Sequence, residues 1–270
     1  ATLPLPCRIL LAEDAPDNQL LLSSLLKKHG AEVTIGDNGQ AAVELALAAD
    51  RTGTPFHVVL MDMHMPVLDG YRATRLLREQ HYHGPIIALT ASAMRGDELK
   101  CREAGCDDYA TKPIDRRKLL RQIAEQVARG QHMPKSFGAT STDLQVAADA
   151  RSHRAAPDQV LDCSVALARA DGEAELLRDV AELFLELCPQ WMDDINAAVK
   201  SGDLPTLKRL AHTLKGSAAN LGAARTYETA YLLEVAAARG DLAGVECAHA
   251  TVRCEIEQLL TAVAKHVTSL

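Results

Sequence analysis

The strongest constraint on the fold of this 270-residue chain is a change of pattern near its middle. Short apolar runs alternate with helical segments in the first half, whereas helical periodicity alone follows residue 162. The apolar runs, typical of buried strands, lie at 8–12, 32–35, 57–61, 86–89 and 108–111. Helical patterns are clearest at 17–28, after Asn38-Gly39 and at 115–128. Regular alternation of strand and helix predicts a five-stranded, parallel, doubly wound α/β sheet with helices on both faces.

The second half is expected to consist of long helices joined by short loops. The helical runs lie at 173–200, 204–220, 224–239 and 242–267. Glycine and aspartate, which end and cap helices, stand between them. Short loops between long helices favour an antiparallel four-helix bundle. Because residues 130–158 mix Gly, Ser, Thr and Pro without apolar periodicity, we predict an α/β domain at 1–129, a flexible linker at 130–158 and an all-α domain at 159–270.

Composition and charge exclude several classes of protein. Aromatic residues make up only 3% of the chain, which argues against an aromatic-packed β-sandwich. The first half is nearly neutral and residues 159–270 are acidic, so neither half has the basic excess of a nucleic-acid binder. No apolar stretch is long enough to span a membrane, and no targeting segment opens the chain. We therefore expect a cytoplasmic segment without membrane contact; the missing initiator Met suggests a piece of a longer protein.

Polar residues stand at the carboxyl ends of the expected strands. Glu13 and Asp14 follow the first strand, Asp62 the third, Thr90 the fourth and Lys112 the fifth. In an open parallel sheet these ends lie side by side, so the five side chains should converge. Crowded carboxylates repel one another unless a cation lies among them, and oxygen ligands suit Mg²⁺. A lysine and a hydroxyl beside them could stabilise a phosphoryl group on a carboxylate.

Four segments of the first half resemble the receiver domain of two-component response regulators. They are LLAED at 10–14, VVLMDMHMPVLDG at 58–70, ALTA at 88–91 and YATKP at 109–113. The resemblance covers about 6–130 and implies a flavodoxin-like fold with Asp62 as the phosphoacceptor. It also implies Mg²⁺ held by Asp14, Asp62 and the backbone carbonyl of His64, with Glu13 acting through a bound water.

The same resemblance implies roles for the later strand ends. Thr90 would bind a phosphoryl oxygen, Lys112 would pair with the phosphate, and the Lys112-Pro113 bond would be cis. Tyr109 stands at the aromatic position whose rotamer follows phosphorylation.

The position of His64, two residues after Asp62, leaves two other site types to consider. A transition-metal site would need further His or Cys ligands, and none is near in the sequence, so we expect His64 to face solvent. A phosphatase of the haloacid dehalogenase type would need a second Asp at position 64, which disfavours that class.

One histidine of the helical half stands among residues suited to phosphate. In the helix expected at 204–220, His212 lies off the apolar stripe and should be exposed, with Lys208 and Lys215 on its face. Gly216, on the same face, is costly in a helix but leaves room for a phosphoryl group or a docking partner. His249 and His266 lack such neighbours, and we interpret them as structural or solvated.

The segments AHTLKGSAANLGA at 211–223 and FLELCPQWMDDI before it resemble the histidine-containing phosphotransfer (HPt) domain. The resemblance covers about 160–270. It implies a four-helix bundle in which His212 carries the phosphoryl group, Lys215 pairs with it, and Gly216 and Ser217 shape the surface.

Together the two resemblances imply a segment of a phosphorelay. A histidine kinase core, in the same polypeptide or a separate one, would phosphorylate Asp62, and His212 would pass the group to the receiver of a downstream response regulator. This domain order resembles the C-terminal part of hybrid sensor histidine kinases. The chain lacks a P-loop, so we do not expect it to bind ATP. An alternative is an interaction module in which receiver phosphorylation only switches partner docking.

Overall fold

The computed structural model describes residues 4–90, 95–112, 114–130 and 160–267. The first part is a five-stranded parallel sheet in the order β2-β1-β3-β4-β5, which confirms the predicted α/β class. Its strands are β1 (Arg8–Ala12), β2 (Glu32–Gly36), β3 (Val58–Asp62), β4 (Ile86–Thr90) and β5 (Asp108–Thr111). Its helices are α1 (Pro16–Lys28), α2 (Gly39–Arg51), α3 (Gly70–Glu79), α4 (Arg95–Ala104) and α5 (Arg116–Gly130).

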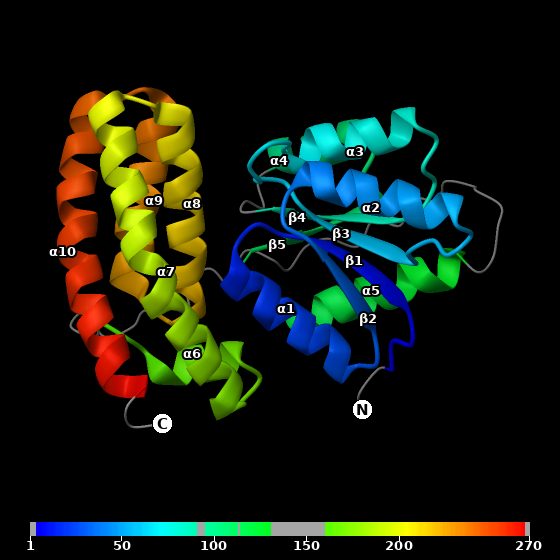
Figure 1. The fold of residues 1–270 in the computed structure, drawn as a ribbon, viewed down its shortest axis with the longest axis horizontal. Coiled ribbons are helices and arrows are strands. Elements are labelled where there is room, and N and C mark those ends of the chain that lie inside the picture. Colours follow the sequence, from blue (N-terminus) through cyan, green and yellow to red (C-terminus); the bar gives the residue numbers. More distant parts are fainter. Residues whose placement is uncertain (1–3, 91–94, 113, 131–159, 268–270) are drawn as a thin grey trace.

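Successive side chains of each strand point to opposite faces, so apolar side chains lie on both faces of this sheet. Ile9 and Leu11 belong to the core under α1 and α5, whereas Leu10 and Ala12 belong to the core under α2 and α3. Strands β3 and β4 are buried along their whole length. Figure 1 shows α1 and α5 on one side of the sheet and α2, α3 and α4 on the other. Burial on both faces explains why these strands are continuous apolar runs.

The second part is a bundle of helices around one apolar core. Its members are α6 (Cys163–Arg169), α7 (Ala174–Ser201), α8 (Leu204–Asn220), α9 (Ala224–Arg239) and α10 (Leu242–Val267). The four long helices match the predicted runs within one residue. Gly202 and Gly240 adopt left-handed φ angles of 70° at the ends of α7 and α9, which glycine does without strain. The short helix α6 was not predicted; the side chain of Asp162 caps it by accepting from Ser164 N and Val165 N.

The two parts meet along α1. This helix contacts α7 and α8, and Leu21 lies in the apolar core of the bundle rather than in the core of the sheet. Figure 1 shows α1 between the sheet and the bundle. The carboxyl ends of the strands therefore lie next to the bundle.

Two predictions fall outside the described residues: the cis bond at Pro113 and, apart from Gly130, the linker at 130–158. Within the described ranges, no helix combines the length and apolar character of a membrane span.

Candidate functional site

Side chains from separate strand ends converge at the edge of the sheet that faces the bundle. Lys112 follows β5, and its Nζ lies 2.7 Å from Glu13 Oε2 and 2.7 Å from Asp62 Oδ2. Carboxylate oxygens of Glu13, Asp14 and Asp62 lie within 4.8 Å of one another. The sheet order explains this convergence, because β3, which ends at Asp62, is the direct neighbour of β1.

Burial sets the protonation behaviour of this acidic cluster. Burial raises the pKa of Glu13 to about 8; Lys112 opposes the shift and Asp62 adds to it. Burial also raises the pKa of Asp14 to about 6, with a further contribution from the Asp62 charge. Burial alone would raise the pKa of Asp62, but the Lys112 ammonium outweighs it and holds this pKa below the ordinary value. Asp62 therefore stays ionised at neutral pH, whereas Glu13 holds its proton most strongly among the three acids.

The loop after β3 brings His64 into the site rather than into solvent. Its backbone N–H donates to Asp62 Oδ1 at 3.0 Å, and its half-buried ring lies 4.8 Å from the ring of His212, centroid to centroid. The prediction that His64 faces solvent is wrong because the bundle covers this loop. Burial and the neighbouring His212 lower the pKa of His64 to about 4.

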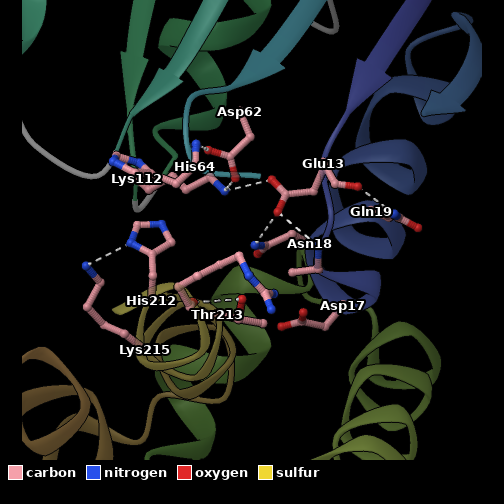
Figure 2. A network of polar contacts seen from close by, with 12 residues as sticks. Glu13, Asp17, Asn18, Gln19, Asp62, His64, Lys112, His212, Thr213 and Lys215 are labelled. Atoms are coloured by element: carbon pink, nitrogen blue, oxygen red, sulfur yellow. Dashed lines mark hydrogen bonds and ion pairs between the residues drawn. The ribbon is translucent and has the colours of Figure 1, made fainter. Parts of the chain in front are cut away.

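His212 and Lys215 are buried, contrary to the predicted exposure of His212. Each is only 8% exposed, because the face of α8 that carries them lies against the sheet domain. In Figure 2 the His212 ring contacts Lys215 through one nitrogen and turns its far side toward His64 and Asp62. Periodicity within α8 correctly places His212 off the bundle core, but it contains no information about a covering domain.

Glu234 on α9 is a site residue that the sequence did not reveal. Its Oε1 lies 2.8 Å from His212 Nδ1, and its Oε2 accepts from Lys215 Nζ at 2.5 Å. Burial would raise the pKa of Glu234, but the contacts with His212 and Lys215 lower it to about 2. Nothing in the local pattern of α9 marks this acid, since its partners come from α8.

A small cavity of about 80 Å³ joins the two groups of residues. Glu13, Asp14, Asp62 and Lys112 line it from the sheet, and His212, Lys215 and Gly216 line it from the bundle. A Cβ atom on Gly216 would lie 3.6 Å from Asn18 Nδ2 of α1. The glycine thus stands where the sheet domain approaches α8, and 3.6 Å is an ordinary van der Waals distance, so the role predicted for Gly216 stays a prediction.

Polar contacts beside the cavity fix the two domains against each other. Asn220 Nδ2 donates to Asp17 Oδ2 and to Asn18 Oδ1, at 2.8 Å each. Asn18 also donates to Glu13 Oε1 at 3.0 Å, which connects the interface to the acidic cluster. Burial raises the pKa of Asp17, and the hydrogen bond from Asn220 opposes that shift.

A group of ion pairs lies at the other end of α1. Lys28 Nζ lies 2.7 Å from Asp171 Oδ2 and 2.6 Å from Glu173 Oε1, and Arg116 lies 3.4 Å from Asp171. Asp171 and Glu173 belong to the loop between α6 and α7. The acidic bundle therefore meets basic side chains of the sheet domain, although such exposed pairs add little stability individually.

Three further predicted residues lie on β4, β5 and α10. Thr90 is buried as the last residue of β4. Tyr109 is half-buried on β5, and its hydroxyl donates to Glu98 Oε2 at 3.2 Å. His249 fits its structural interpretation, since its Nε2 lies 2.7 Å from Asn196 Oδ1.

Comparison with known proteins places each part in a family. The response regulator receiver domain model matches residues 9–124, and the Hpt domain model matches residues 179–266. The sensor histidine kinase GacS of Pseudomonas protegens is 33% identical over 78% of this chain and 22% of its own length. The signal transduction histidine-protein kinase BarA of Escherichia coli K12 is 29% identical over 84% of this chain and 23% of its own length.

Among solved structures, the magnesium-bound receiver domain of sensor histidine kinase PA1611 from Pseudomonas aeruginosa PAO1 is 40% identical. It covers 46% of this chain and 99% of its own, with a TM-score of 0.41. This chain spans less than a quarter of the length of these two histidine kinases. With both family models matched in this order, the chain belongs to the two-component phosphorelay proteins that join a response regulator receiver domain to an Hpt domain.

Proposed function

We propose that Asp62 accepts a phosphoryl group from a kinase histidine and exchanges it with His212 of the same chain. His212 then passes the group to an aspartate of a separate receiver domain. The observation that carries the proposal is the position of the His212 imidazole, which has a ligand atom within 4.8 Å of an Asp62 carboxylate oxygen. Residues 150 positions apart would not meet in this way without docking of the two domains.

The reaction at this site is an exchange between two energy-rich bonds. As a phosphorus–nitrogen bond forms to His212, the phosphorus–oxygen bond to Asp62 breaks, and its electron pair returns to the carboxylate. Because an acyl phosphate and a phosphoramidate have similar transfer energies, the site needs mainly positioning and charge stabilisation. Lys112 from the sheet can supply positive charge beside Asp62, and Lys215 from the bundle can supply it beside the His212 ring. Thr90 would hydrogen-bond a phosphoryl oxygen.

Glu234 would prepare His212 for this exchange. When the ring is neutral, a proton on Nδ1 satisfies the Glu234 carboxylate and leaves the lone pair on Nε2. In Figure 2 that second nitrogen is on the side of the ring that faces Asp62. Glu234 would also hold Lys215 beside the ring through its second oxygen.

We expect Glu234→Gln to slow transfer from Asp62 to His212 by roughly tenfold, because the neutral amide fixes the ring tautomer less strongly. Transfer is measured by rapid quench with phosphorylated chain, and the tautomer by ¹⁵N chemical shifts of the His212 ring. Glu228→Gln, at an exposed position of the same helix, is the matched control and should behave as wild type. An unchanged rate together with unchanged ring shifts in Glu234→Gln would refute the positioning role.

Magnesium is the cofactor that fits the acidic cluster. The donor set consists of carboxylate oxygens, which Mg²⁺ prefers, and the pKa values of Glu13 and Asp14 are raised by burial and by the Asp62 charge, both of which a dication would offset. Asp14, Asp62 and the backbone carbonyl of His64 would hold the ion, with Glu13 acting through a bound water. The ion would neutralise charge on the phosphoryl oxygens.

The affinity for Mg²⁺ should rise with pH between about 6 and 8. Protons compete with the ion for Glu13 and Asp14, whose pKa values are raised to about 8 and about 6, so more protons must leave at the lower pH. We expect roughly tenfold tighter binding at pH 8 than at pH 6 by isothermal titration calorimetry. Glu13→Gln should flatten the upper part of this profile; equal affinity at both pH values in the wild type would contradict the assignment.

The partners of the segment are a histidine kinase core and a downstream receiver domain, both in the cytoplasm. A receiver-gated interaction module is disfavoured by the burial of His212 beside Asp62, since docking alone would not require the two acceptors to meet.

The proposed transfer is tested by incubation of the chain with a phosphorylated histidine kinase core and Mg²⁺. We expect label first on Asp62, as base-labile phosphate, and then on His212, as acid-labile phosphate. Label on neither residue would refute the proposal.

A further inference from the structure

A second group of possible metal ligands overlaps the acidic cluster only at Asp62. Asp62, His64 and His212 each offer a ligand atom, and these atoms lie within 4.8 Å of one another. The three come from β3, the loop after it and α8, so both domains contribute. Two imidazoles and one carboxylate suit Zn²⁺, which prefers nitrogen ligands, better than Mg²⁺, which prefers oxygen.

The arrangement of the two rings fits a shared ion. The ring centroids are 4.8 Å apart and the ring planes differ by 37°. Imidazoles bound side by side to one Zn²⁺ have centroids about 5 Å apart, because each metal–nitrogen bond is about 2.0–2.1 Å long. Ligand atoms of a tetrahedral Zn²⁺ lie about 3.4 Å apart, so these atoms need to approach by up to about 1.5 Å, which rotation of the side chains can supply.

Two further observations point to a ligand at this position. Among the described residues, Nδ1 of His64 is buried and has no hydrogen-bond partner. A buried polar atom without a partner is costly, and coordination would satisfy it. His212 already contacts the Glu234 carboxylate through Nδ1, as metal-bound histidines commonly contact a carboxylate through the nitrogen that does not bind the metal. Asp62 and His212 line the cavity of about 80 Å³, which leaves room on their side of the site for a water molecule.

We propose that Asp62, His64 and His212 form a Zn²⁺ site between the two domains, with water in the fourth position. Bound zinc would hold the domains together and occupy both phosphoacceptors, so it would inhibit the relay. The inference rests on the docked arrangement of the domains and not on phosphoryl transfer itself. The same geometry could take Co²⁺, which provides a spectroscopic probe.

Binding is tested on the full chain in excess Mg²⁺, with Cys247→Ser and Cys254→Ser in every sample, because these exposed thiols are alternative zinc ligands. We expect one Zn²⁺ per chain by calorimetry and a visible Co²⁺ absorption band typical of four-coordination. His64→Ala should weaken Zn²⁺ binding at least about tenfold, whereas His83→Ala, at an exposed histidine, should not change it. Equal Zn²⁺ affinity in both variants, or no binding to the wild type, would overturn the proposal.

A separate measurement, small-angle scattering, tests whether the Zn²⁺ site lies between the two domains. Zn²⁺ should shift the small-angle scattering of the wild type toward a more compact form and should leave His64→Ala unchanged. Zinc that binds through His64 without compaction would refute an interdomain site. Because neither measurement involves phosphoryl transfer, their outcome is independent of whether the relay proposal holds.

Discussion

Asp62→Asn is expected to reduce phosphoryl incorporation from a phosphorylated kinase core by more than about a hundredfold. The amide of asparagine is not a nucleophile, and no neighbouring group can take its place: Glu13 is held by Lys112 and has a pKa raised to about 8 by burial. The variant should fold, because the asparagine oxygen can still accept from His64 N and Lys112 keeps its contact with Glu13. Label is measured on Phos-tag gels and by its base lability.

Asp69→Asn is the matched control for this loss. Asp69 lies in the same loop and caps α3 by accepting from Arg72 N, a role that asparagine fills equally well. It should be labelled like the wild type. Base-labile label of normal amount in Asp62→Asn would show that another carboxylate is the acceptor.

His212→Gln is expected to leave labelling of Asp62 intact and to lower acid-labile label on the bundle to below about 1% of wild type. Glutamine has no ring nitrogen with a nucleophilic lone pair, but its amide can still donate to Glu234 and preserve the packing of α8 against α9. The chain should then accumulate phosphate on Asp62, because the route to a second receiver is closed. Quenched time courses at acid and alkaline pH separate the two kinds of label, because phosphohistidine is lost in acid and phosphoaspartate in base.

His249→Gln is the corresponding control on α10. This half-buried histidine contacts Asn196 rather than a phosphoacceptor, so its replacement should not alter acid-labile labelling. If His212→Gln still carried acid-labile phosphate, a different histidine would have to be the acceptor in the bundle.

Local patterns were sufficient to predict most of the fold. Strand runs such as 8–12 and helix runs such as 204–220 are set by apolar periodicity and by glycine or aspartate at the ends, which are local features. The short helix α6 escaped prediction because seven residues hold too few turns for a periodic signal. The convergence of Glu13, Asp62 and Lys112 was also predictable, since a parallel sheet fixes where its strand ends lie.

Contacts between the two domains could not be predicted from the sequence. The expected exposure of His64 and His212 was wrong. Each side chain lies off the core of its own domain, and the opposite domain covers it. Glu234 and Asn220 acquire their partners through helix packing and docking, which leave no local pattern. Periodicity records which face of a helix is buried within its own domain; it does not record what covers the opposite face.

Docking within one chain has a consequence for the relay. With His212 8% exposed against Asp62, a second receiver cannot reach the histidine until the domains separate. The contacts that would be broken include the polar ones of Asn220 with α1 and of Lys28 with Asp171, and the apolar packing of Leu21 in the bundle core. The docked form therefore suits transfer between Asp62 and His212, and an open form suits transfer onward.

The most direct test of transfer within one chain compares the wild type with an equimolar mixture of Asp62→Asn and His212→Gln chains. Each variant in the mixture keeps one acceptor, so His212 can be labelled only by an encounter between two molecules. Tethered domains reach effective concentrations in the millimolar range. At about 1 μM chain, we therefore predict that the wild type labels His212 roughly 10²–10⁴ times faster than the mixture, at a rate independent of concentration. Equal rates in the two samples would contradict transfer within one chain.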